Sequence, residues 1–94
     1  MKIDFRKIEA SDIEGNKSTY DLSKELGNAI YRNTPDLGEL EFAQEIYKNG
    51  EVEVDGHKAG IIRTYMEKGQ FLAFIKKSVY ELLDSINQKT NDHE

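Results

Sequence analysis

The sequence has no cysteine and a single proline in 94 residues. The absence of cysteine excludes disulfides, thiolate metal sites and thiol nucleophiles. No apolar run approaches the roughly 20 residues that a membrane-spanning helix needs. The first residues alternate apolar and charged side chains, unlike the apolar stretch of a signal peptide. We therefore expect a cytoplasmic protein that does not bind a membrane.

Glycine-rich nucleotide loops are also missing. The seven glycines are scattered, and neither a GxGxxG nor a GxxxxGK spacing occurs. A chain of this length has room for one ordinary domain and not for a cofactor domain beside a substrate domain. We expect one domain over residues 1–87, a disordered tail over residues 88–94, and no cofactor or metal.

Acidic residues outnumber basic residues, and the two kinds are unevenly distributed along the chain. The formal net charge is -5, which disfavours binding to a phosphate backbone. Residues 36–55 contain seven acids against Lys48, whereas residues 57–77 contain five bases against Glu67. Either these two segments pack near each other within the fold, or an acidic surface of one copy meets a basic surface of another.

Alternating residues predict the strands. Residues 2–8 have the period of a half-buried strand, residues 10–17 are rich in turn formers, and residues 18–22 return as a second strand. Residues 51–54 alternate acids with valine, so we expect them to join the hairpin as a third strand.

Apolar residues at three- and four-residue spacing predict the helices. The first follows Leu22. Thr34 and Pro35 predict the start of the second as cap and first helical residue, and its apolar stripe begins at Leu37. A third helix precedes Gly69, and the last, over about residues 71–87 beginning with Leu72 on its apolar face, is the longest. Two glycines inside helices, Gly27 and Gly60, predict close packing of one backbone on another.

These patterns together predict an α+β fold. We expect a small antiparallel sheet, made of the N-terminal hairpin and the strand near residues 51–54, packed against about four helices.

Four aromatic residues fall partly off the apolar stripes and form a candidate interaction surface: Tyr31, Phe42, Tyr47 and Tyr80. Aromatic residues left outside a core are typical anchors of protein interfaces. They predict a protein partner or a second copy, as in a homodimer.

The alternative is a nucleic-acid-binding accessory protein that uses residues 58–77. Its candidate basic patch is Lys58, Arg63, Lys68, Lys76 and Lys77. The helix, glycine and helix around Gly69 loosely resemble a helix-turn-helix. The overall acidity opposes this alternative.

An enzyme is the third class of function. His57 follows Asp55 and could act as a general base if a cleft brought a carboxylate to it. No nucleophile lies at a spacing that completes a catalytic set, so a surface histidine at a helix start is preferred. Likewise, the alternating acids Glu51, Glu53 and Asp55 are interpreted as a solvated strand face rather than a cation site. We expect no enzymatic activity.

Residues 21–54 contain three segments that resemble those of a known family: LGNAIY, NTPDLGE and EIYKNGEVEV. With the MKIDF start, they resemble a family of short proteins of unknown function from prophage and conjugative-element gene clusters of Bacteroides-group bacteria. The resemblance covers about the first 55 residues and brings no catalytic residues. It implies a small accessory protein of a mobile genetic element, which we expect to serve as a non-enzymatic interaction module.

Overall fold

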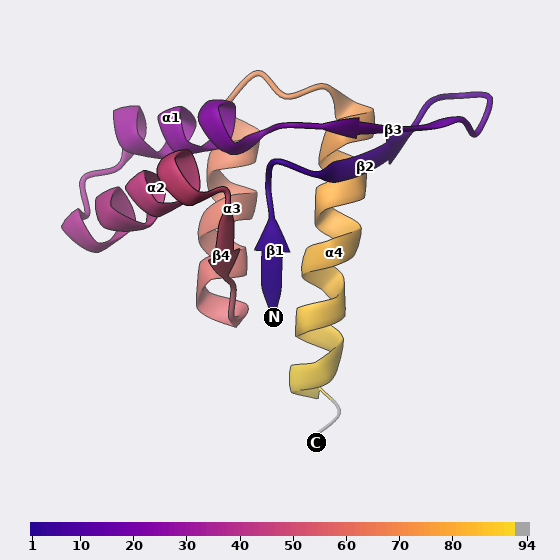
Figure 1. Cartoon of the computed structure of the whole chain (residues 1–94). Helices are drawn as coiled ribbons and strands as arrows, with labels where there is room; N and C mark the ends of the chain where they lie inside the picture. Colours follow the sequence, from indigo (N-terminus) through magenta and orange to yellow (C-terminus); the bar gives the residue numbers. More distant parts are fainter. Residues whose placement is uncertain (92–94) are drawn as a thin grey trace.

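The computed structural model describes the backbone of residues 1–91 and the side chains through Ile86. Four helices and four short strands make up this part of the chain (Figure 1). Their order is β1 (Lys2–Asp4), β2 (Ile8–Ser11), β3 (Lys17–Tyr20), α1 (Ser23–Asn33), α2 (Leu37–Asn49), β4 (Glu51–Glu53), α3 (Gly56–Lys68) and α4 (Ala73–Asn91). The predicted α+β class is confirmed. No helix in the described part of the chain is long and apolar enough to cross a membrane.

The strands form two separate antiparallel ribbons instead of the single three-stranded sheet predicted from the sequence. β1 pairs with β4, with Ile3 opposite Val52, and β2 pairs with β3. The first predicted strand breaks in two because a turn follows β1, in which the Lys7 N–H donates to the Asp4 carbonyl (3.1 Å). Phe5, fully buried, lies at this junction. The prediction that the hairpin and residues 51–54 share one sheet is therefore wrong.

α1 and α2 are antiparallel neighbours that pack at unusually close range. A Cβ built on Gly27 would lie 3.0 Å from the Tyr47 Cβ and 3.1 Å from the Ala43 carbonyl oxygen. The predicted role of Gly27 in close packing is confirmed. The same prediction for Gly60 is wrong, since a Cβ there would meet nothing within 4 Å.

α2 begins two residues later than the sequence predicts. Asp36 is the N-cap, and its carboxylate accepts from the backbone N–H groups of Gly38 (2.7 Å) and Glu39 (3.1 Å). Thr34 instead accepts from the Asp36 N–H and donates to the Glu39 carboxylate (2.6 Å). Pro35 thus precedes the cap rather than following it.

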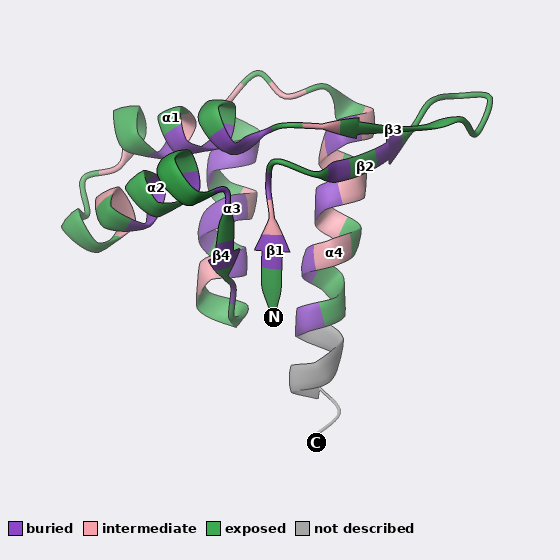
Figure 2. Cartoon of the chain, in the orientation of Figure 1, coloured by how far each residue is buried: buried purple, intermediate pink, exposed green. Residues whose placement is uncertain are grey.

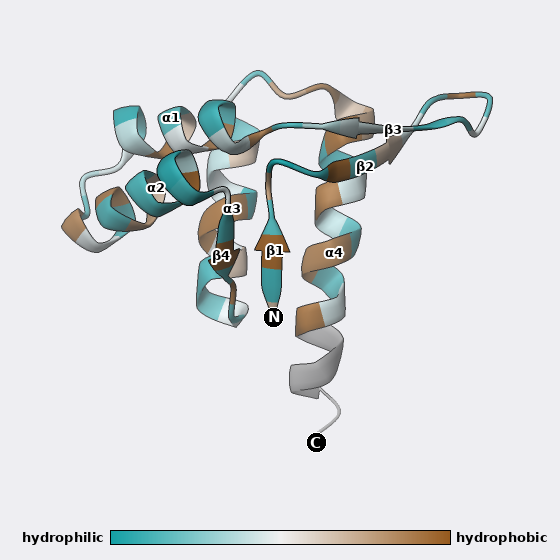
Figure 3. Cartoon of the chain, in the orientation of Figure 1, coloured by the Kyte–Doolittle hydropathy of each residue, from teal (hydrophilic) through white to brown (hydrophobic). Residues whose placement is uncertain are grey.

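The core lies where the inner faces of the helices meet the two ribbons (Figure 2). β2 packs on α4, α3 packs on α1 and α4, and β4 packs on α2. The apolar faces of the helices point inward and their polar faces outward (Figure 3). α4, with 19 residues, is the longest of the four helices described. It continues to Asn91, past the predicted domain boundary at residue 87, while residues 92–94 of the predicted tail lie outside the described residues.

Candidate protein-interaction surface

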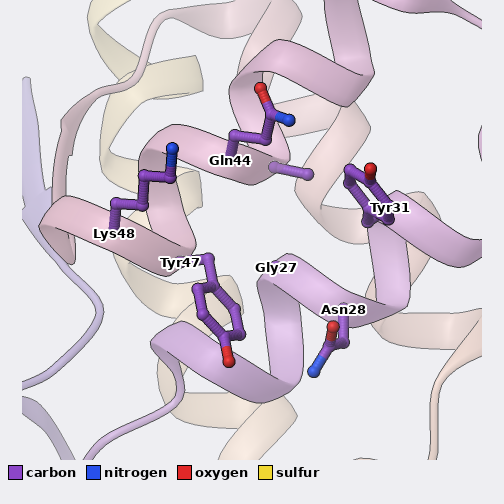
Figure 4. Close-up of a pocket in the computed structure, with 7 residues that line it drawn as sticks. Gly27, Asn28, Tyr31, Gln44, Tyr47 and Lys48 are labelled. Carbon is purple, nitrogen blue, oxygen red and sulfur yellow. The ribbon is translucent and has the colours of Figure 1, made fainter.

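A groove runs between the outer faces of α1 and α2 and has a volume of about 230 Å³. Gly27, Asn28 and Tyr31 line it from α1. Ala43, Gln44, Tyr47 and Lys48 line it from α2. Figure 4 shows the two tyrosine rings on either side of Gly27. We call this hollow the α1–α2 groove.

The same residue spacing on both helices produces the groove. Tyr31 follows Gly27 by four residues, and Tyr47 follows Ala43 by four, so each tyrosine lies one turn beyond a small residue on the same helix face. The small residues allow the helices to approach and leave a floor without long side chains. Tyr31 and Tyr47 are 48% and 44% exposed. Two half-exposed rings therefore form walls over a shallow apolar floor.

The charged side chains at the groove are lysines. Lys48 lines the groove, and the Lys24 ammonium lies 5.4 Å from the centroid of the Tyr47 ring, within the range of a cation–π contact. No described acidic residue lines the groove. The charged side chains at the groove are thus opposite in sign to the net charge of the protein, which is -5.

The other two aromatic candidates lie elsewhere. Phe42 is only 3% exposed and belongs to the core, so its prediction as a surface anchor is wrong. It lies off the main stripe of α2 but faces the neighbouring α3, where the Lys58 ammonium lies 5.2 Å from its ring centroid. Half-buried Tyr80 of α4 does not line the groove; its ring packs on Arg63 (5.0 Å) and its hydroxyl donates to Glu67. Burial, together with the hydrogen bond to Glu67, raises the pKa of Tyr80 to about 12.

Every member of the candidate basic patch contacts a carboxylate or an aromatic ring of its own chain. Three pair with acids: Arg63 with Asp84, Lys76 with Glu67 (3.4 Å), and Lys77 with Glu81 (3.7 Å). Lys58 lies over Phe42 and Lys68 over Tyr65. The five cations therefore already have partners on the α3 and α4 surface.

The acids that neutralise this basic segment come from α3 and α4, not from residues 36–55. No ion pair among the described side chains joins the two segments of opposite charge. They do lie near each other within the fold, since the Tyr65 hydroxyl donates to Glu39 and the Lys58 ammonium lies over the Phe42 ring. Glu41, Glu45 and Glu51 remain exposed and make no ion pair with another described side chain.

His57 is exposed in the first turn of α3 and lines an open hollow of about 320 Å³ with Glu39 and Tyr65. Glu39 Oε1 already accepts from the Tyr65 hydroxyl (2.7 Å) and from Thr34 (2.6 Å). No hydrogen bond joins His57 to another described residue. The predicted neighbouring acid, Asp55, caps α3 by accepting from the Lys58 N–H (2.8 Å). The hydrogen bond from Lys58 lowers the pKa of that carboxyl.

The row of Glu51, Glu53 and Asp55 likewise forms no cation site. No group of three or more His, Cys, Asp or Glu side chains in the described part of the chain could hold a metal ion. Glu53 instead pairs with the N-terminal ammonium of Met1 (3.2 Å).

Three exposed aliphatic residues were missed by sequence reasoning. Leu37 and Leu72, both assigned to apolar stripes, are 78% and 65% exposed. Leu37 is the first residue of α2 and Leu72 precedes α4, so neither reaches the core. Ile13, at the tip of the β2–β3 hairpin, is fully exposed. Its position between residues that favour turns is the feature of the sequence that predicts this exposure.

Comparison of the chain with protein-family models, curated proteins and solved structures finds no match.

Proposed function

We propose that this chain is a non-enzymatic protein-interaction module that docks its partner in the α1–α2 groove. The observation that carries the proposal is the pair of half-exposed tyrosines, Tyr31 and Tyr47, which lie on either side of Gly27 in a groove that Ala43 also lines. Tyrosine is enriched among the residues that dominate binding energy at protein interfaces.

The size of the groove favours a side chain over a small-molecule ligand. Its volume of about 230 Å³ lies below the range of about 300–1,000 Å³ typical of small-molecule sites. An open depression of this size accommodates one or two apolar side chains from a partner. Inserting one would bury apolar surface against two rings that change little on binding, since each ring has few rotatable bonds.

The hydrogen bonding around His57 supports a non-enzymatic role. A general base needs a substrate-facing proton acceptor and usually a second group that orients it. Near His57, the hydroxyls of Tyr65 and Thr34 and the Oε1 atom of Glu39 are engaged with one another. They therefore serve to join α2 to α3.

The biological setting belongs to the same proposal. The resemblance of residues 21–54 supports an accessory protein of a mobile genetic element. The absence of a membrane-crossing helix in the described residues is compatible with a module that works in the cytoplasm.

Site-specific photo-crosslinking in the cells that encode the protein tests the docking surface. A benzophenone-bearing amino acid replaces Gln44, an exposed residue of the groove. The matched control carries it at Glu81, an exposed position on α4. We expect a discrete adduct from position 44, its loss when Tyr47→Ser is added, and its retention with Leu72→Ser, which removes an exposed apolar side chain elsewhere.

Two results would contradict the proposal. One is the absence of any adduct that is specific to position 44 in the folded protein. The other is an adduct that is unchanged by Tyr47→Ser and by Tyr31→Ser, since the tyrosine walls would then contribute nothing to docking. Circular dichroism of each variant establishes that it is folded.

A further inference from the structure

The tip of the β2–β3 hairpin presents a fully exposed isoleucine between two acids. Ile13 is flanked by Asp12 and Glu14. The Asp12 carboxylate accepts from the backbone N–H groups of Glu14 and Asn16, each at 2.9 Å. These bonds hold the loop in one shape, so the apolar side chain and its flanking carboxylates are presented together.

The hairpin tip and the α1–α2 groove are complementary in chemistry. The tip carries one apolar side chain with acids beside it, whereas the groove has an apolar floor, two aromatic walls and Lys24 and Lys48 at its edge. We propose that the partner of the groove is a second copy of this chain, whose Ile13 inserts between Tyr31 and Tyr47. This inference rests on the proposed function, since it uses the same groove.

The positions of the two surfaces define the geometry of the assembly. The hairpin tip and the α1–α2 pair lie at opposite ends of the molecule (Figure 1). A chain therefore cannot insert its tip into its own groove. The contact is head-to-tail, so it leaves a free groove at one end and a free tip at the other, and it extends into a chain or closes into a ring.

Charge complementarity favours a copy of this chain as the partner. The charged residues at the groove are lysines although the molecule is acidic overall, and the acids beside Ile13 supply the opposite sign next to the apolar anchor. Electrostatics of this kind fixes orientation and speeds association, while the apolar insertion provides most of the affinity.

Sedimentation and light scattering of the purified protein over a concentration series test the inference. The wild-type protein is expected to increase in mass with concentration. Ile13→Ser and Tyr47→Ser are each expected to weaken association by at least about tenfold, the effect of truncating a central interface residue. Leu72→Ser is the matched control and should leave the mass distribution unchanged.

Mixing the two variants gives the decisive result. Ile13→Ser retains an intact groove, and Tyr47→Ser retains an intact tip. A head-to-tail contact predicts that the mixture forms a 1:1 heterodimer that does not grow further. A contact that uses other surfaces would not give this outcome.

Charge inversion provides a second test that leaves the apolar residues intact. Glu14→Lys and Lys48→Glu should each weaken self-association by about fivefold or less, as expected for exposed charges. The double variant should recover part of the loss, because each acid then meets a lysine on the neighbouring copy. Added salt should reduce the effect of each single inversion.

A wild-type protein that stays monomeric at all concentrations, or Ile13→Ser and Tyr47→Ser variants that associate like the wild type, would overturn the inference. The proposed function has a separate readout. A position-44 adduct with a different polypeptide, together with a monomeric purified protein, would remove self-association and leave the groove as a docking site.

Discussion

Gly27 of α1 packs directly against Tyr47 of α2, and a Cβ on Gly27 would lie 3.0 Å from the Tyr47 Cβ. The contact fixes how closely the two helices approach. It also determines the depth of the groove, because the Tyr47 ring rises from the point where the backbones meet.

Replacing Gly27 and Gly60 with alanine should change stability in opposite directions. Gly27→Ala should destabilise the fold by about 1–3 kcal/mol, because overpacking forces the backbones apart. Gly60→Ala meets nothing within 4 Å and should stabilise it by about 0.5–1 kcal/mol through helix propensity alone. Urea unfolding of both variants measures the difference. Equal changes in the free energy of unfolding would show that a side chain at position 27 is accommodated by a shift of α1 away from α2.

Removing the cap of α2 should cost a moderate amount of stability. Asp36→Ala leaves the N–H groups of Gly38 and Glu39 without their carboxylate partner, so we expect a loss of about 1 kcal/mol. Asp36→Asn keeps an oxygen acceptor and should retain most of the stability. Urea midpoints compare the two, and an alanine variant as stable as the asparagine variant would contradict the capping role.

Tyr80 should limit stability in alkali. Its pKa in the folded protein is raised from 10.0 to about 12, first by burial and then by Glu67. The unfolded chain therefore loses the proton first, and the contribution of Tyr80, complete below pH 10.0, falls as the pH rises towards 12. Tyrosinate absorbance should lose its highest-pKa component in Tyr80→Phe. Urea midpoints for that variant should depend less on pH in this range.

Asp4 should contribute to stability only while it is ionised. Its carboxylate accepts from the Arg6 guanidinium at 3.0 and 3.1 Å, and this hydrogen bonding lowers its pKa below 3.8. The contribution is present above pH 3.8 and is lost as the pH falls through the lowered pKa.

Urea unfolding of Asp4→Asn tests this dependence. The wild type should be the more stable protein near neutral pH, and the difference should narrow in strong acid. With Arg6→Gln as the background, Asp4→Asn should have a smaller effect. A difference that is constant with pH would exclude the ionised pair as its cause.

Nucleic-acid binding should be absent while the cations of α3 and α4 keep their carboxylate partners. We expect no salt-dependent binding of duplex DNA at up to about 100 μM protein, the weak end of non-specific affinity. A variant with Glu67→Gln, Glu81→Gln and Asp84→Asn frees three cations and should gain weak binding that disappears with added salt. Fluorescence anisotropy measures both. Tight, salt-dependent binding by the wild type would restore the nucleic-acid hypothesis.

The helices could be predicted from the sequence because their signals are local. The spacing of Ile75, Val79 and Leu83 identifies the buried face of α4, and Gly50 and Gly69 follow the last residues of α2 and α3. Strand pairing could not be predicted in the same way. The partner of Ile3 is Val52, and a short strand has the same alternation whichever distant strand it joins.

The candidate surface was predicted in part. Tyr31 and Tyr47 were identified as leaving the core, but which neighbours they have depends on the α1–α2 crossing. Phe42 has a similar position in the helical pattern and is nevertheless buried, and the Lys58 ammonium of α3 lies over its ring. Only the placement of neighbouring helices distinguishes these residues. The repeated small-residue and tyrosine spacing is visible in the sequence, but only the structure shows that the two helices place these residues around one groove.

The pairing of β1 with β4 also has a consequence for synthesis. It closes a loop that contains the hairpin, α1 and α2, and such distant contacts form later than local ones. At about 5–20 residues per second, the ribosome needs roughly 2–9 s to add the residues between the two strands. During that time the nascent chain exposes Ile3 without its partner, so its first strand is open to chaperones until the middle of the protein emerges.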